Sequence, residues 1–174
     1  GLSGRVDENI ELELSADKVA VLNDAEQAVL NFSTNSDNES TDNLVNKKAY
    51  VLRLTGLVGP KRHPGKFLLN GRMLNNPKAI VNLIHQHDAV GLIYTLLQGD
   101  IGGGIFNGVS STQVTKKQYY QAAANALKLP KPNFEDSDLV SANDFKIVSG
   151  QKAPKMIAYT FIYNDLLKWL EQVE

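Results

Sequence analysis

Cysteine is absent from this chain of 174 residues. Without thiolates the protein cannot form a disulfide framework, a cysteine-ligated zinc or iron–sulfur site, or a cysteine nucleophile. An excess of charge of one sign is absent as well, because 18 lysine and arginine residues stand against 19 aspartate and glutamate residues and leave a net charge of −1. Since the basic residues are also scattered along the chain, we expect no binding to nucleic acid.

Long hydrophobic runs are missing too. The longest mostly apolar stretch, residues 89–97, is far shorter than the ~20 residues that a membrane span requires. The first residues include Arg5, Asp7 and Glu8 and contain no apolar core of a signal peptide. With 43% hydrophobic residues the composition is that of an ordinary globular chain. The length permits one domain with a small appended lobe, and we expect a cytoplasmic protein without membrane contacts.

The first third of the chain contains one predicted helix and one predicted strand. Ser15 can cap a helix that runs to about Asn31, with Asp17 in the first turn, where a carboxylate favours the helix dipole. Residues 33–48 begin with a long polar run that has little apolar surface to bury and are predicted to form a flexible surface loop. Residues 49–54 read Ala-Tyr-Val-Leu-Arg-Leu, a short β-rich run that predicts a buried strand.

The remaining two thirds alternate between β-rich runs and helical patterns. Helices are predicted after Asp88, from about Thr115 to Pro130, and after Asn164, whose side chain can cap the last one. Short strands are predicted at residues 81–84, 102–107 and 145–148. In the helix after Asp88, apolar residues recur at i, i+3, i+4 and i+7 and predict its buried face; they are Val90, Ile93, Tyr94 and Leu97. This alternation favours the α/β class with a mainly parallel sheet.

The chain lacks the common nucleotide-binding and hydrolase signatures. Residues 102–104 are three glycines, but they precede a strand and do not follow one, so they are better explained by a tight strand entry than by a phosphate cradle. Ser110 and Ser111 do not lie in a G-x-S-x-G elbow and are interpreted as the approach to a helix. Asp136 and Asp138 lie in a predicted loop, where carboxylates are usually solvated.

The densest candidate for binding is the loop 59–66, Gly-Pro-Lys-Arg-His-Pro-Gly-Lys. It follows a predicted strand, which is where α/β folds place ligand loops, and its prolines stiffen it. Arg62 could hold a phosphate or carboxylate by a two-pronged contact, with Lys66 beside it, although both could equally be solvated surface charges.

Three histidines allow a metal hypothesis. His85 and His87 would share one face of an extended chain, and His63 could complete a three-histidine zinc site. No motif with metal-ligand spacing supports this, so we predict no metal. His85 is expected to pack at the rim of a cleft, with Asp88 capping the helix behind it.

Two segments together resemble a known family. Residues 52–60, Leu-Arg-Leu-Thr-Gly-Leu-Val-Gly-Pro, and residues 81–85, Val-Asn-Leu-Ile-His, followed by Asp88, resemble the second half of the extended short-chain dehydrogenase/reductases, the NAD(P)-dependent epimerase/dehydratase superfamily. Residues 53–66 look most like a bacterial subgroup of uncharacterised epimerase-like proteins. The resemblance implies an α/β fold, namely the C-terminal part of a Rossmann-like parallel sheet with a small substrate-binding lobe.

The resemblance also implies a division of the chain and a set of site residues. Residues 1–54 would be the tail of a nucleotide-binding fold, and residues 55–174 the substrate-binding lobe, interleaved with the last sheet strands. Thr55 and Gly56 would lie at the edge of the cofactor, NAD or NADP, whose main binding segment would belong to an N-terminal half outside this chain. The substrate would be bound by four residues, with Arg62 contacting its anionic group; they are Arg62, His63, Asn82 and His85.

The Tyr-x-x-x-Lys pair of this superfamily is not recognisable. It should fall near residues 14–25, where the lysine present is Lys18 and the residue four positions earlier is Leu14. No catalytic residue is therefore assigned, and two hypotheses remain. In the first, this chain is the substrate-binding part of an NAD(P)-dependent protein that acts on a sugar nucleotide or small polar metabolite, is inactive without its N-terminal half, and could form a homodimer. In the second, the protein is a catalytically inactive dinucleotide-binding sensor or scaffold.

Overall fold

The strands of this protein pair in parallel. The computed structural model describes residues 4–34, 48–99, 101–135 and 145–172. Partner strands lie far apart in the sequence, and such parallel pairing needs long crossover connections between them. The predicted α/β class with parallel strands is thereby confirmed. The three pairs are β2 (Tyr50–Leu54) with β5 (Gly104–Gly108), β3 (Gly56–Val58) with β4 (Leu83–His85), and β1 (Arg5–Val6) with β6 (Ile147–Val148).

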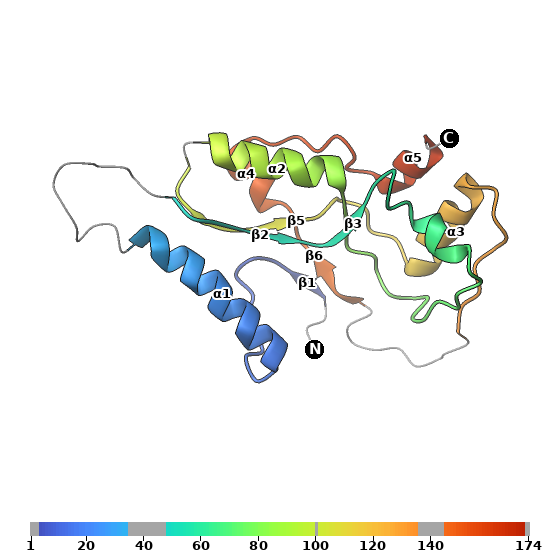
Figure 1. The fold of residues 1–174 in the computed structure, drawn as a ribbon, viewed down its shortest axis with the longest axis horizontal. Helices are drawn as coiled ribbons and strands as arrows, with labels where there is room; N and C mark the ends of the chain where they lie inside the picture. The colour runs from blue at the N-terminus through green and yellow to red at the C-terminus, as the bar shows by residue number, and fades with distance from the viewer. Residues whose placement is uncertain (1–3, 35–47, 100, 136–144, 173–174) are drawn as a thin grey trace.

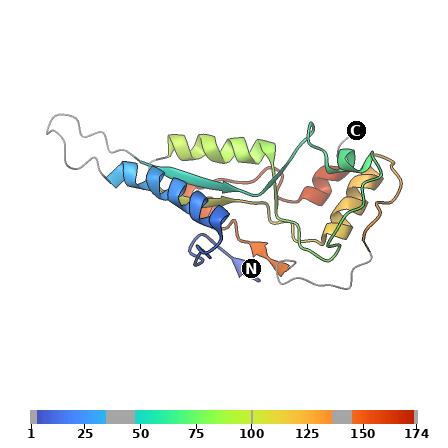
Figure 2. The ribbon, with the colours of Figure 1, turned by 60° about the horizontal axis from the view of Figure 1, so that its bottom comes forward.

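Helices cover both faces of the β2–β5 pair. Helix α1 (Asp17–Thr34) lies on one face, and α2 (Gln86–Gln98) with the short α4 (Lys152–Ile157) lies on the other (Figures 1 and 2). Beneath α2 and α4 is the first of two hydrophobic clusters, which is closed by Ile84 of β4 and Phe106 of β5. Its fully buried or nearly buried members are Ile84, Ala89, Leu92, Leu96, Phe106, Ala153 and Ile157.

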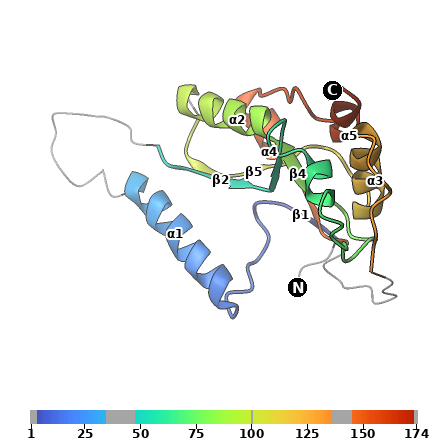
Figure 3. The same ribbon diagram turned by 45° about the vertical axis from the view of Figure 1, so that its right-hand side comes forward.

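A second cluster lies at the other end of the molecule. There α3 (Lys116–Ala126) packs against α5 (Leu166–Glu171) and against the 3-10 turn η2 (Pro64–Leu68), as Figure 3 shows. The side chains of this cluster come from the end of β3 and from the two helices, so it anchors the C-terminal helix; they are Val58, Tyr119, Ala123, Leu166, Trp169 and Leu170.

The predicted buried face of α2 is wrong. The exposed fractions of Val90, Ile93, Tyr94 and Leu97 run from 44% to 70%, whereas Ala89, Leu92 and Leu96 are at most 4% exposed. Helix α2 carries two apolar stripes at helical spacing, and periodicity alone does not say which of them meets the sheet. The first turn decides which stripe is buried, because Asp88 is buried and Leu92 and Leu96, one and two turns later, lie on the same face of the helix.

Several local boundaries also differ from the prediction. Helix α1 continues to Thr34, so the predicted loop starts later, and its residues 35–47 lie outside the described residues. Asp165, not Asn164, caps α5, because its carboxylate accepts the N–H groups of Leu167 and Lys168. Helix α4 was not predicted.

Candidate functional site

A cavity of about 280 Å³ lies between α1, the end of β2 and the β1–β6 pair. Helix α1 contributes both apolar and polar side chains to it, and the strands and the loops that follow them contribute both kinds as well. The described residues that line it are Val6, Asp7, Ile10, Leu12, Val19, Leu22, Asn23, Glu26, Arg53, Leu54, Thr55, Asn107, Lys146 and Val148. Such a mixture suits a small ligand with both apolar and polar groups.

An ion pair closes one wall of this cavity. Arg53 of β2 donates two hydrogen bonds to the carboxylate of Glu26 on α1, from Nε at 2.8 Å and from Nη2 at 2.5 Å. The hydrogen bond to Glu26 raises the pKa of Arg53. Because both charges are used on each other, the pair fixes α1 to the sheet and does not present a free cation to a ligand.

Two polar side chains on the cavity wall are held in place by the backbone around them. Thr55 donates its hydroxyl to the carbonyl of Gly108 at 3.0 Å, which leaves the oxygen lone pairs as acceptors. Asn107 donates its amide to the carbonyl of Ser149 at 3.1 Å, and its own N–H is bound by Glu8 at 2.8 Å. The site therefore has preset geometry before any ligand enters it.

The two residues predicted at the cofactor edge have different surroundings. Thr55 lines the cavity. Gly56 does not, and a Cβ atom at this position would lie 2.6 Å from a methyl group of Leu83. A side chain at this position would therefore have to displace the end of the Leu83 side chain.

His63 and His85 lie in the second hydrophobic cluster. His63 caps η2 and His85 caps α2, each accepting a backbone N–H on its Nδ1 atom, at 3.1 Å and 3.2 Å. Their rings flank the indole of Trp169, with centroid distances of 5.6 Å and 4.9 Å. Burial lowers the pKa of both histidines. Because Nδ1 accepts a bond, the neutral ring carries its proton on Nε2, and this atom has no hydrogen-bond partner in either residue.

Asn82 and Arg62 lie apart from the cavity as well. Asn82 cross-links the chain to β6, since its amide donates to the carbonyl of Lys146 at 2.9 Å and its Oδ1 accepts the N–H of Val148 at 2.7 Å. Arg62 is exposed in a turn that its own N–H closes onto Gly59 directly after β3. The structure thus brings His63 and His85 into contact with one tryptophan, and a ligand-binding role of the four residues stays a prediction.

Asp88 has a different role from the predicted one. It is 0% exposed, and its carboxylate accepts the hydroxyl of Tyr159 and the N–H groups of Ile162 and Tyr163. The cap of α2 is His85 instead, because Asp88 lies in the first turn and points toward the segment that follows α4. As for the zinc hypothesis, no three potential ligand side chains come together among the residues that the structure describes.

Sequence reasoning missed the residues that form the cavity wall. Glu26 and Arg53 meet across 27 positions, and Glu8 reaches Asn107 across 99. No local spacing signals such pairs. A partial signal existed in Arg53, a charged residue within an otherwise apolar strand, which needs a partner if the strand is covered.

Within the described residues, no helix is both long and apolar enough to cross a bilayer. No family model matches the sequence. Protein YeeZ from Escherichia coli strain K12 is 34% identical over 125 residues, which are 72% of this chain and 44% of YeeZ. The chain therefore spans less than half the length of this curated relative.

Solved structures reveal the fold. The UDP-glucuronic acid 4-epimerase from Bacillus cereus, in complex with NAD, superposes with a TM-score of 0.73 at 15% identity, over 99% of this chain and 54% of the epimerase. DesIV, the dTDP-glucose 4,6-dehydratase from Streptomyces venezuelae with NAD bound, gives a TM-score of 0.70 at 16% identity, over 98% of this chain and 53% of the dehydratase. This chain has the fold of the NAD-dependent epimerases and dehydratases. The resemblance of residues 52–60 and 81–85 to that superfamily is confirmed for the fold, and the coverage of little more than half of the epimerase and the dehydratase agrees with a C-terminal portion.

Proposed function

We propose that this chain is the substrate-side part of an NAD(P)-dependent protein of the epimerase/dehydratase type, acting on a sugar nucleotide or another small polar metabolite. The observation that carries the proposal is the preset cavity between α1, β2 and the β1–β6 pair, in a fold whose solved neighbours hold NAD. The proposed cofactor edge is Thr55, whose free lone pairs can accept one hydrogen bond from an amide.

The residues present fit the edge of such a cofactor and not the whole of it. The cavity of about 280 Å³ is too small for a dinucleotide, because drug-sized pockets already fill roughly 300–1,000 Å³. We therefore propose that the main cofactor site lies in an N-terminal half of the same protein. When bound, a nicotinamide cofactor supplies hydride transfer.

Exposed apolar side chains support this division. On α1, Val21, Leu22 and Phe32 are between 65% and 68% exposed, and α2 presents the stripe described above. Apolar groups in such number on both covering helices indicate surfaces that another part of the protein buries.

The second candidate function is a dinucleotide-binding sensor without chemistry. It is favoured by the lack of a Tyr-x-x-x-Lys pair at the start of α1. Lys18 lies in the first turn, but the residue four positions earlier is Leu14, which is 52% exposed and precedes the helix. A phenol that could donate a proton is missing from residues 4–34, the described part of the chain next to the cavity.

Titration of the full-length protein with NADH and NADPH, followed by UDP-glucose and UDP-glucuronic acid, tests both candidates by calorimetry and absorbance. We expect one dinucleotide to bind and a sugar nucleotide to bind to that complex. Spectral turnover identifies an enzyme, whereas binding without turnover identifies the sensor. Absence of binding by both dinucleotides overturns the proposal.

Arg62 provides a test at the substrate end. Since Arg62 is exposed, Arg62→Ala should leave the unfolding transition unchanged and weaken sugar-nucleotide binding about tenfold or more, the usual effect of losing a charged hydrogen bond. Arg72→Ala, at another exposed arginine, is the matched control and should keep the original affinity. An unchanged affinity in Arg62→Ala removes Arg62 from the site.

A further inference from the structure

A second cavity, of about 300 Å³, lies on the other side of the β1–β6 pair. The alternation of side chains along a strand explains the arrangement: in β1, Val6 lines the cavity beside α1, and its neighbour Arg5 lines the second one. The two cavities share Val148 of β6, but the lining of the second contains neither a residue of α1 nor Thr55 of the proposed cofactor edge.

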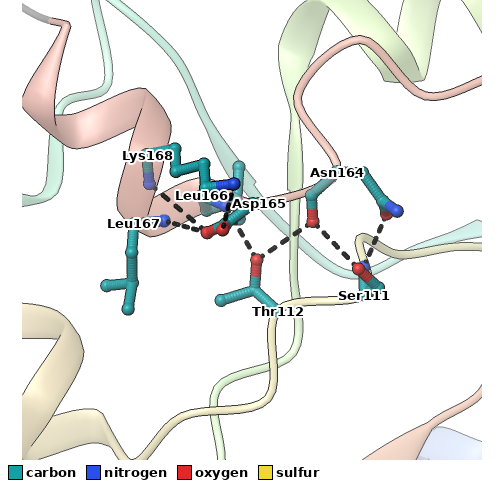
Figure 4. Close-up of polar contacts among 7 residues, drawn as sticks. All are labelled: Ser111, Thr112, Asn164, Asp165, Leu166, Leu167 and Lys168. Atoms are coloured by element: carbon teal, nitrogen blue, oxygen red, sulfur yellow. Dashed lines mark hydrogen bonds and ion pairs between the residues drawn. The ribbon is translucent and has the colours of Figure 1, made fainter.

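The charges around this cavity have one sign. Arg5 and Lys155 line it, and none of the lining residues that the structure describes is an aspartate or glutamate. Two described carboxylates that lie close in sequence to lining residues have other surroundings. Asp7 lines the other cavity, and Asp165 is bound to the first N–H groups of α5 and to the ammonium of Lys168 (Figure 4). A cavity with two cations and no opposing charge favours an anion.

The uncharged polar groups add hydrogen-bond donors. Ser110 and Ser149 are 6% and 9% exposed, and their hydroxyls can donate to a ligand. Asn164 accepts the N–H of Ser111 on its Oδ1 atom at 2.9 Å, which leaves the NH₂ end of the amide as a donor.

The wall that holds Asn164 is rigid. The backbone carbonyl of Asn164 accepts hydrogen bonds from the hydroxyls of Ser111 and Thr112. The hydroxyl oxygen of Thr112 in turn accepts the N–H of Leu166 at 2.8 Å (Figure 4). This network joins the loop after β5 to the start of α5, so the donors are positioned before a ligand arrives. Phe161 adds a half-buried ring to the lining.

We propose that this second cavity binds a small organic anion. Its phosphate or carboxylate group lies between Arg5 and Lys155, and its apolar body packs on Phe161. A volume of about 300 Å³ is at the lower end of the range for small-molecule sites, so the ligand is of the size of a single substituted ring. The inference does not depend on the proposed function, because it uses no residue of the first cavity.

The test uses phenyl phosphate, benzoate and the uncharged phenol as probes, titrated into the full-length protein by calorimetry. We expect phenyl phosphate or benzoate to bind and phenol to fail, and the tighter of the two anions identifies the preferred anionic group. The Arg5→Gln, Lys155→Gln double variant should lose at least about tenfold in affinity, since charged hydrogen bonds carry the binding. Both residues are exposed, so the thermal unfolding of the variant should match that of the parent.

Lys117→Gln is the matched control, because Lys117 is exposed on α3 and does not line the cavity; it should bind like the parent. Saturating NADH should not compete with the anion. Failure of both anions to bind at millimolar concentration, an unchanged affinity in the double variant, or competition by NADH overturns the proposal. The first two results leave dinucleotide binding, and hence the proposed function, to its own titration, whereas competition would itself show that NADH binds.

Discussion

Asp88 holds three donors of a segment that has no regular secondary structure of its own, residues 159–163. Burial, together with the hydrogen bond to this carboxylate, raises the pKa of Tyr159. All three partners donate, so both carboxylate oxygens must accept. An amide can accept at one end only, and its NH₂ end would face a donor.

Asp88→Asn should therefore lower the free energy of unfolding by about 2 kcal/mol, the cost of leaving a buried donor without its partner. Urea unfolding followed by circular dichroism measures this loss. Asp165→Asn is the control, because asparagine caps a helix about as well as aspartate, and its stability should stay within about 0.5 kcal/mol of the parent. Equal midpoints for Asp88→Asn and the control would contradict the role of Asp88.

His63 and His85 make stability depend on pH. Burial lowers the pKa of both below the ordinary value of 6.5, so the unfolded chain takes up protons first as the pH falls. Their contribution to stability is complete above about pH 6.5 and is lost as the pH drops below it. The urea midpoint should accordingly fall between pH 7.5 and pH 5.

The double variant His63→Asn, His85→Asn should flatten this dependence. Asparagine keeps a side-chain acceptor at both helix caps but removes the titrating rings. Trp169 is the single tryptophan of the chain and contacts both histidines, so its fluorescence reports the transition directly. His87→Asn, at an exposed residue, should retain the slope of the parent, and a steep slope in the double variant would contradict the assignment.

At the scale of elements, α1 is attached to the sheet by few interactions. None of its side chains described over residues 17–32 is buried, and the bidentate pair of Glu26 with Arg53 is its clearest polar link to β2. Both side chains of this pair are less than one quarter exposed, at 18% and 23%, so solvent screens it only in part.

Glu26→Gln should loosen α1 without unfolding the rest of the protein. The charged, two-pronged contact becomes a single neutral one, at a cost of about 1 kcal/mol. Hydrogen exchange of the α1 amides should become faster, while exchange in β2 and α2 stays as in the parent. Asp24→Asn on the same helix is the control and should leave α1 unchanged, since Asp24 is exposed. Equal exchange in both variants would show that the pair does not hold α1.

At the scale of the molecule, the outer stripe of α2 is an exposed apolar surface, and the two partners that we propose for it are an N-terminal half of the same protein and a second copy. The stripe consists of Val90, Ile93, Tyr94 and Leu97. A surface of this kind on a lone chain favours association. We therefore expect residues 1–174, produced alone, to self-associate with increasing concentration.

Ile93→Lys, Leu97→Lys should abolish that self-association in analytical ultracentrifugation, and Gln98→Lys, at an exposed polar residue of the same helix, should not. In the full-length protein the same double variant distinguishes between the two proposed partners. A lowered melting temperature shows that the N-terminal half covers the stripe, and dissociation of a dimer with the fold intact shows that a second copy does. No change in either property would contradict both.

Local patterns were sufficient for most of the elements. The β-rich run at residues 49–54 predicted β2, the helix expected near Asp88 is α2, and Thr115 opens α3 with a capping box. These signals act through neighbouring backbone groups, so they can be read from a few consecutive residues. The order of the motifs at residues 52–60 and 81–85 also predicted the fold that the solved structures show.

The site could not be predicted in this way. Arg62, His63, Asn82 and His85 stand out in the sequence because their types carry chemistry, but the structure uses three of them to cap helices and to bind β6. The cavity wall instead comes from Glu26 and Arg53, which are distant in sequence.

The amino-acid sequence by itself determined where most of the strands and helices form, because capping, turn formation and side-chain alternation are local. Its motifs at residues 52–60 and 81–85 indicated the fold through their resemblance to a known superfamily. Only the tertiary structure decided which stripe of α2 is buried and which polar residues meet at a cavity. These outcomes depend on contacts between elements far apart in the chain, and their energies exist only after the elements have packed together.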